Sequence, residues 1–106
     1  MHDNLYVYVE MTFNSIQEAD EAKKDLKEDI KEVLGDKPRI WRKGDQVRMG
    51  ISYIDLITKF SMKEQEFDED MFKLLSEKVT GIMDALPIDW VECQISLNLH
   101  MVDNED

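Results

Sequence analysis

The chain has few of the residues that build disulfides, metal centres or phosphate-binding loops. Cys93 is the only cysteine among 106 residues, so no internal disulfide can form and paired-cysteine metal sites are excluded. Its place in a run of alternating apolar residues predicts a buried, unreactive thiol. The chain has four glycines, and they form no glycine-rich phosphate loop. His2 and His100 lie at opposite ends of the sequence. We therefore expect no metal site and no cofactor.

Long apolar segments and targeting signals are missing as well. No apolar run approaches the roughly 20 residues that a membrane-spanning helix needs. The first four residues lack the basic and apolar regions of a secretory signal. These absences predict a cytoplasmic protein with no membrane partner.

Positive charge is scarce. The sequence has 24 acidic and 13 basic side chains, for a formal net charge of −11. This excess repels nucleic-acid backbones and anionic membranes, and it attracts basic surfaces. With 42% hydrophobic and 35% charged residues, the composition is typical of a globular protein. We expect one domain over residues 1–102, followed by an acidic tail over residues 103–106.

Two apolar periodicities alternate along the chain, one of two residues, typical of strands, and one of three to four residues, typical of helices. The predicted elements are a strand over Leu5–Phe13, a helix over Ile16–Leu34, a hairpin over Ile40–Ile54, a helix over Phe67–Leu86 and a strand over Val91–Met101. With right-handed crossovers, this order predicts an α+β fold of the ferredoxin-like β-α-β-β-α-β type. Its antiparallel sheet would have the strand order 4-1-3-2, and both helices would cover one face.

Within this plan the first helix has the clearest ends. Ser15 and Glu18 have the spacing of a capping box, and Gly35 supplies a left-handed stop. The stretch Ile54–Glu66 stays open between strand, loop and helix start. The second helix begins either near Ser61 or after Asp68.

The predicted buried positions follow from the same periodicities. They are Leu5, Val7, Val9, Met11 and Phe13 in the first strand, Ile16, Ala19, Ala22, Leu26, Ile30 and Val33 in the first helix, Val47, Met49, Ile51 and Tyr53 in the hairpin, Met71, Leu74, Leu75, either Lys78 or Val79, Ile82 and Leu86 in the second helix, and Val91, Cys93, Ile95, Leu97, Leu99 and Met101 in the last strand. Phe67 and Phe72 would form a hydrophobic staple if the second helix starts at Asp68.

Carboxylates gather where the second helix is expected to start. The run comprises Glu64, Glu66, Asp68, Glu69 and Asp70. The helix dipole explains two or three of them, and a solvated acidic face is the alternative explanation for the rest. A further acidic excess lies along the first helix. Such carboxylates on a rigid surface can imitate a row of phosphates, so we assign the run to partner binding.

Basic side chains are concentrated in the hairpin. Arg39, Trp41, Arg42, Lys43 and Arg48 lie close together in the sequence and could contact an anion or an acidic partner. The alternative is edge protection, in which charges on an outer strand prevent stray strand pairing. The first helix could also neutralise part of this charge.

Tyr6 and Tyr8 are expected on the open face of the sheet. RNA-recognition domains stack bases on such rings, but they need a basic field and rings on both central strands. Because the third strand presents Arg48, Gly50 and Ser52 instead, we predict no direct nucleic-acid binding and assign the tyrosines to a protein interface. The last strand has little outward charge, so a homodimer through that strand or the open face is a further hypothesis.

Together these features predict a non-catalytic, acidic protein-binding module. A small, motif-free, acidic chain resembles inhibitors that occlude a nucleic-acid-binding enzyme, as phage anti-defence proteins do. The alternative is a dimeric regulatory domain that senses a small molecule near Arg48 and His100. An enzyme built around His100 is the least favoured hypothesis, because His100 and Cys93 would project from opposite faces of the last strand.

Overall fold

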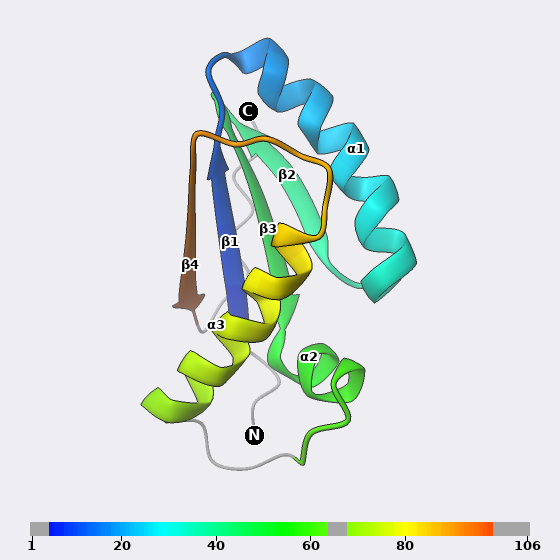
Figure 1. The fold of residues 1–106 in the computed structure, drawn as a ribbon, viewed down its shortest axis with the longest axis vertical. Helices are drawn as coiled ribbons and strands as arrows, with labels where there is room; N and C mark the ends of the chain where they lie inside the picture. The colour runs from blue at the N-terminus through cyan, green and yellow to red at the C-terminus, as the bar shows by residue number, and fades with distance from the viewer. Residues whose placement is uncertain (1–4, 64–67, 99–106) are drawn as a thin grey trace.

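A computed structural model describes residues 5–63 and 68–98 (Figure 1). Its elements are β1 (Tyr6–Thr12), α1 (Ile16–Leu34), β2 (Arg39–Lys43), β3 (Gln46–Ser52), α2 (Tyr53–Lys59), α3 (Glu69–Asp84) and β4 (Glu92–Asn98). The bounds of α1 are those that its apolar spacing and caps predict. The predicted acidic tail lies outside the described residues, as does the end of the last predicted strand.

The four strands form one antiparallel sheet in the order β2-β3-β1-β4. Read from the other edge this is the predicted order 4-1-3-2, with β1 and β3 in the centre. Val9 lies opposite Met49 of β3 on one side and Ile95 of β4 on the other. The α+β class is therefore confirmed.

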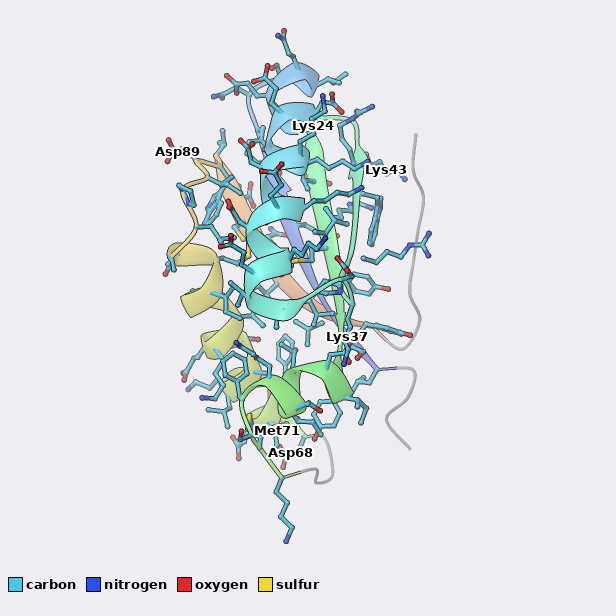
Figure 2. The ribbon with its side chains drawn as sticks, turned by 90° about the vertical axis from the view of Figure 1, so that its right-hand side faces the viewer. Lys24, Lys37, Lys43, Asp68, Met71 and Asp89 are labelled. Carbon is cyan, nitrogen blue, oxygen red and sulfur yellow. The ribbon has the colours of Figure 1, made fainter. Side chains whose placement is uncertain are left out.

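One core joins the sheet to the helices. Val7, Val9 and Met11 of β1 are fully buried in it. The same core contains Ala19, Ala22, Leu26 and Ile30 of α1, and Met71, Leu75, Val79 and Met83 of α3. Figure 2 looks onto α1, with α3 on its left and β2 on its right.

Local hydrogen bonds fix both ends of α1. The Ser15 hydroxyl accepts a bond from the Glu18 amide at 3.1 Å, and the Glu18 carboxylate accepts one from the Asn14 amide at 3.3 Å. The carboxylate of this capping box therefore reaches one residue beyond the usual cap amide. Gly35 ends the helix with φ 73°, and its amide donates to the Lys31 carbonyl at 3.0 Å.

The hairpin ends earlier than predicted, and it is followed by α2, a short helix in addition to the two that were predicted. Ser52 caps α2 by accepting a bond from the Asp55 amide at 3.1 Å. Tyr53, predicted as a strand residue, is instead the first residue of α2, and its amide donates to the Leu5 carbonyl at 2.8 Å. The change in apolar parity after Ile54 therefore marks a helical turn that buries Leu56, so the prediction of a strand up to Ile54 is wrong.

Of the two predicted starts for α3, the one at Asp68 is correct. Its Oδ1 accepts a bond from the Met71 amide at 2.8 Å, which satisfies an otherwise unpaired donor of the first turn. The predicted staple involves Phe67, which lies outside the described residues. The helix ends at Asp84, before the predicted Leu86.

Among the residues whose burial the structure describes, three that were predicted to be buried are exposed, and the predicted burial of Leu97, Leu99 and Met101 lies outside them. The three exposed residues are Ile16 at 58%, Leu74 at 40% and Val91 at 62% exposed. Ile16 and Leu74 lie beside the buried stripe of their helices, outside the arc that faces the sheet. Val91 precedes the first residue of β4. Cys93 and Ile95 are only partly buried, since β4 is an edge strand.

Candidate partner-binding surface

The charged side chains of α1 divide between two flanks of the helix. At 3.6 residues per turn, residues separated by steps of three and four lie on one side. One flank carries Glu18, Glu21, Asp25, Asp29 and Glu32 and no lysine, and the other, the lysine flank, carries Lys23, Lys24, Lys27 and Lys31 together with Asp20 and Glu28. We call the first of these sets the acidic flank. The helix is thus polarised across its width.

The acidic flank forms one wall of a groove. Two adjoining hollows of about 320 and 580 Å³ run along it and meet at Pro87. The opposite wall is the C-terminal half of α3 and the loop that leads to β4. That loop contributes Asp89, which Figure 2 shows at the upper left of α1. We call this hollow the α1–α3 groove.

The groove has apolar side chains between its charged walls. They are Phe13, Ala22, Val33, Phe60, Ile82, Ala85, Leu86, Pro87 and Ile88. Phe60, Ile82, Leu86 and Ile88 are partly buried and pack against the core. The one basic side chain among the lining residues is Lys78, whose Nζ lies 5.0 Å from the centre of the Phe60 ring.

The ion pairs between described side chains of α1 and its surroundings lie away from the groove. Asp20 is 3.8 Å from Lys24 and 3.8 Å from Arg42 of β2, and Lys31 is 3.8 Å from Asp36. Among the described residues, no ion pair engages the carboxylates of the acidic flank. The groove is therefore acidic, whereas the side of α1 that faces β2 combines lysines with paired charges; Figure 2 shows Lys24, Lys37 and Lys43 on that side.

The acidic run predicted at the start of α3 lies apart from this groove. Glu64 and Glu66 are outside the described residues. Asp68 caps α3, and Glu69 and Asp70 are exposed in its first turn. The groove contacts the opposite half of α3, from Lys78 onward. Figure 2 accordingly shows Asp68 at the bottom of the molecule and Asp89 near the top.

The tyrosines of the open face belong to an aromatic cluster. The ring centroids of Tyr6 and Tyr8 are 6.4 Å apart. The ring centroids of Tyr8 and Trp41 are 6.1 Å apart, and these two rings meet edge-on. Tyr8 and Trp41 are 6% and 1% exposed, respectively. In the sheet, Gly50 of β3 lies opposite Tyr8, and Trp41 lies opposite the neighbouring Arg48. Tyr8 and Trp41 therefore offer almost no surface to a partner, contrary to the roles that the sequence suggests for them.

The basic residues of the hairpin do not form one patch. Arg42 lies on the α1 side of β2, where it pairs with Asp20 and donates to the Gly44 carbonyl at 2.8 Å. Arg48 lies on the open face, 3.9 Å from Glu10, and donates to Gln46 Oε1 at 2.9 Å. The predicted neutralisation by the first helix is thus present at Arg42.

Arg39 and Lys43 are exposed at the two ends of β2, on its open face. Because His100 lies outside the described residues, the hypothesis of a ligand site between Arg48 and His100 gains no support from them. Among the described residues, no group of three or more histidine, cysteine or acidic side chains is placed to hold a metal ion. In the same part of the chain, no helix is both long and apolar enough to cross a membrane.

Cys93 lines a small hollow of about 180 Å³ beside α3, together with Thr80, Met83, Asp84, Trp90 and Ile95. Burial of the thiol raises its pKa above the usual value, and the negative charge of Asp84 raises the pKa further. A thiol with a raised pKa is a poor nucleophile at neutral pH.

No protein-family model matches the chain, and searches of curated proteins and of solved structures gave no significant match. The α1–α3 groove as a unit is not predictable from the sequence. A signal for its acidic wall is present, since five carboxylates recur at helical spacing from Glu18 to Glu32. The opposite wall comes from a distant segment, and spacing within α1 cannot reveal it.

Proposed function

We propose that this protein is a non-catalytic binding module that docks its acidic surface on a basic surface of a partner protein. The partner would itself bind nucleic acid, and the module would inhibit it by occupying that surface, as phage anti-defence proteins do. The observation that carries this proposal is the division of charge on α1, with the carboxylates of the acidic flank gathered along one groove.

The spacing of these carboxylates is comparable to that of a nucleic-acid strand. Glu18 and Glu32 are fourteen residues apart, which corresponds to about 21 Å along an α-helix. Five carboxylates divide this length into four intervals of roughly 5 Å, against one charge per about 3.4 Å for a DNA strand. A cationic site that accepts a phosphate row could therefore accept this flank.

The ferredoxin-like arrangement is part of the same proposal. Strand order and the shared core of α1 and α3 support it. In this arrangement both helices cover one face of the sheet, so α1 is held rigidly and its carboxylates keep their spacing. A rigid charged surface loses less conformational entropy on binding than a flexible acidic tail does.

Affinity capture tests this function. The whole chain is immobilised, proteins are captured from the native host, and each captured partner is identified by mass spectrometry and purified. We expect a partner that binds DNA or RNA and that is displaced from the module by its own nucleic acid. A partner that binds the module and its nucleic acid at the same time, without competition, would contradict the inhibitor role.

A further inference from the structure

We propose that the α1–α3 groove binds an α-helix of the partner, one with an apolar stripe flanked by lysine or arginine side chains. This inference rests on the proposed function and names the element of the partner that the module recognises. It also identifies the acidic flank, rather than the start of α3, as the binding surface.

The apolar residues of the groove favour a ligand that has apolar side chains as well as positive charge. Ile82, Leu86 and Ile88 are only partly buried, so a ligand that covers them gains hydrophobic free energy. A nucleic-acid backbone or a purely basic loop cannot provide that contact. An amphipathic helix presents both an apolar stripe and charged side chains beside it.

The spacing of the acidic flank also favours a helix over an extended segment. Its carboxylates recur once per turn of α1, about every 5.4 Å. A helix lying along α1 places side chains at the same repeat, so several lysines can meet several carboxylates. An extended strand places its same-side residues about 6.6–6.8 Å apart, and the two repeats lose register along a groove of roughly 21 Å.

A second copy of this chain does not fit as the occupant. The lysine flank of α1 is basic, but the apolar stripe beside it, with Leu26 and Ile30, is buried in its own core. The last four residues of the chain include three carboxylates, so they would be repelled from the groove. The occupant that remains is a basic amphipathic helix of another protein.

A peptide titration with the whole protein tests this inference. The probe is a synthetic helix of leucine and lysine, about 15 residues long to span roughly 21 Å. Two comparison peptides are used: a scrambled one of the same composition with no apolar stripe, and a leucine–glutamate helix. We expect the amphipathic lysine peptide to bind most tightly and to shift the NMR amide signals of α1 together with those of Ile82 to Ile88.

Two triple variants with the same change of charge locate the site. Glu21→Gln, Asp25→Asn and Glu32→Gln remove three negative charges from the groove, whereas Glu69→Gln, Asp70→Asn and Glu77→Gln remove three from α3 outside it. We expect the groove variant to lose about tenfold in affinity for the peptide, as three partly exposed ion pairs imply. The α3 variant should lose less than threefold.

The alternative outcomes separate this inference from the proposed function. Equal binding of the scrambled peptide, or an equal loss in both variants, would overturn the groove inference but leave a general acidic module intact. A failure of every lysine-rich peptide to bind at low salt would contradict both. A partner that competes with nucleic acid but is insensitive to the groove variant would overturn only the groove inference.

Discussion

Asp68 shows how much a single side chain contributes to the local structure. Its carboxylate lies in the acidic run that the sequence assigns to a partner, yet it accepts a hydrogen bond from the Met71 amide at 2.8 Å. Its negative charge also interacts favourably with the helix dipole. At this position, therefore, structure explains the residue without any ligand, whereas Glu69 and Asp70 have no comparable cap role.

We expect Asp68→Ala to lower the free energy of unfolding by about 1 kcal/mol, the usual loss when an N-cap is removed. Asp68→Ser should recover most of this loss, because a serine hydroxyl also accepts the Met71 amide. Urea denaturation of both variants measures the difference. Equal stability of Asp68→Ala and the wild type would show that the cap does not stabilise α3.

Cys93 gives a prediction with a defined pH dependence. Burial and Asp84 raise its pKa in the folded state, so the unfolded chain ionises first as the pH rises. The unfolded state then binds fewer protons, and stability falls as the pH passes from the ordinary thiol pKa towards the folded pKa. Below the ordinary pKa the contribution is fully present.

At pH 8, Cys93 of the folded protein should react with iodoacetamide several-fold more slowly than Cys93 of the protein unfolded in urea. The rate for the folded protein should rise in more alkaline solution. Cys93→Ser, which does not ionise in this range, should remove the thiol's share of the loss of stability at alkaline pH. Fast alkylation of the folded protein at pH 7 would contradict the burial of this thiol.

At the scale of elements, the acidic flank works against the stability of α1. Asp25 lies four residues from both Glu21 and Asp29, and like charges at this spacing destabilise a helix by about 0.2–0.5 kcal/mol per pair. Asp20, on the other flank, lies 3.8 Å from Lys24 and from Arg42. A row of mutually repelling carboxylates along a groove lowers the stability of the helix, and such a row is consistent with a binding role.

Opposite effects are therefore expected from two equivalent substitutions on α1. Asp25→Asn should raise the free energy of unfolding by about 0.5 kcal/mol at low salt, because it removes two repulsive pairs. Asp20→Asn should lower it slightly, because it removes attractive pairs. Thermal denaturation at low and at 1 M salt measures both effects, and both should shrink at high salt. Destabilisation by Asp25→Asn would indicate an attractive partner for this carboxylate.

The elements also show how far the sequence alone could predict the structure. Periodicity and caps are local properties, so the bounds of α1 and the faces of β1 could be predicted. The α2 helix could not, because seven residues are too short for periodicity to separate a helix from a strand. Tyr53 fits both patterns, and only the Ser52 cap reveals the turn.

Contacts between segments that are distant in the sequence could not be predicted either. Trp41 reads as part of a basic hairpin, but its burial against Tyr8 depends on the order of β2, β3 and β1. The α1–α3 groove likewise combines Glu18 with Asp89 and Asp29 with Lys78. Residue types on each element were predictable, whereas their joint surface required the fold.

For the whole molecule, the net charge of −11 makes self-association and partner binding respond to salt in opposite directions. Two copies repel each other, so salt should strengthen a homodimer, whereas salt weakens the attraction to a basic partner. The edge strand β4, with Cys93 and Ile95 partly buried, is one surface through which copies could pair. The open face with Tyr6 is the other.

We predict a homodimer at high micromolar concentration, measured by sedimentation velocity at several salt concentrations. Combining Gln94→Glu with Ser96→Glu should weaken a dimer formed through β4, because like charges then face each other across paired strands. Tyr6→Asp should weaken a dimer formed through the open face instead. A monomer at all concentrations and salts would rule out both modes.

The salt dependence of partner binding tests the central claim most directly. The dissociation constant for the captured partner is measured between low and high salt for the wild type and for the triple variant at Glu21, Asp25 and Glu32. The account predicts affinity that falls steeply with salt in the wild type, and a clearly shallower dependence in the variant. Affinity that does not change with salt, or an equal slope in both proteins, would contradict docking through the acidic flank.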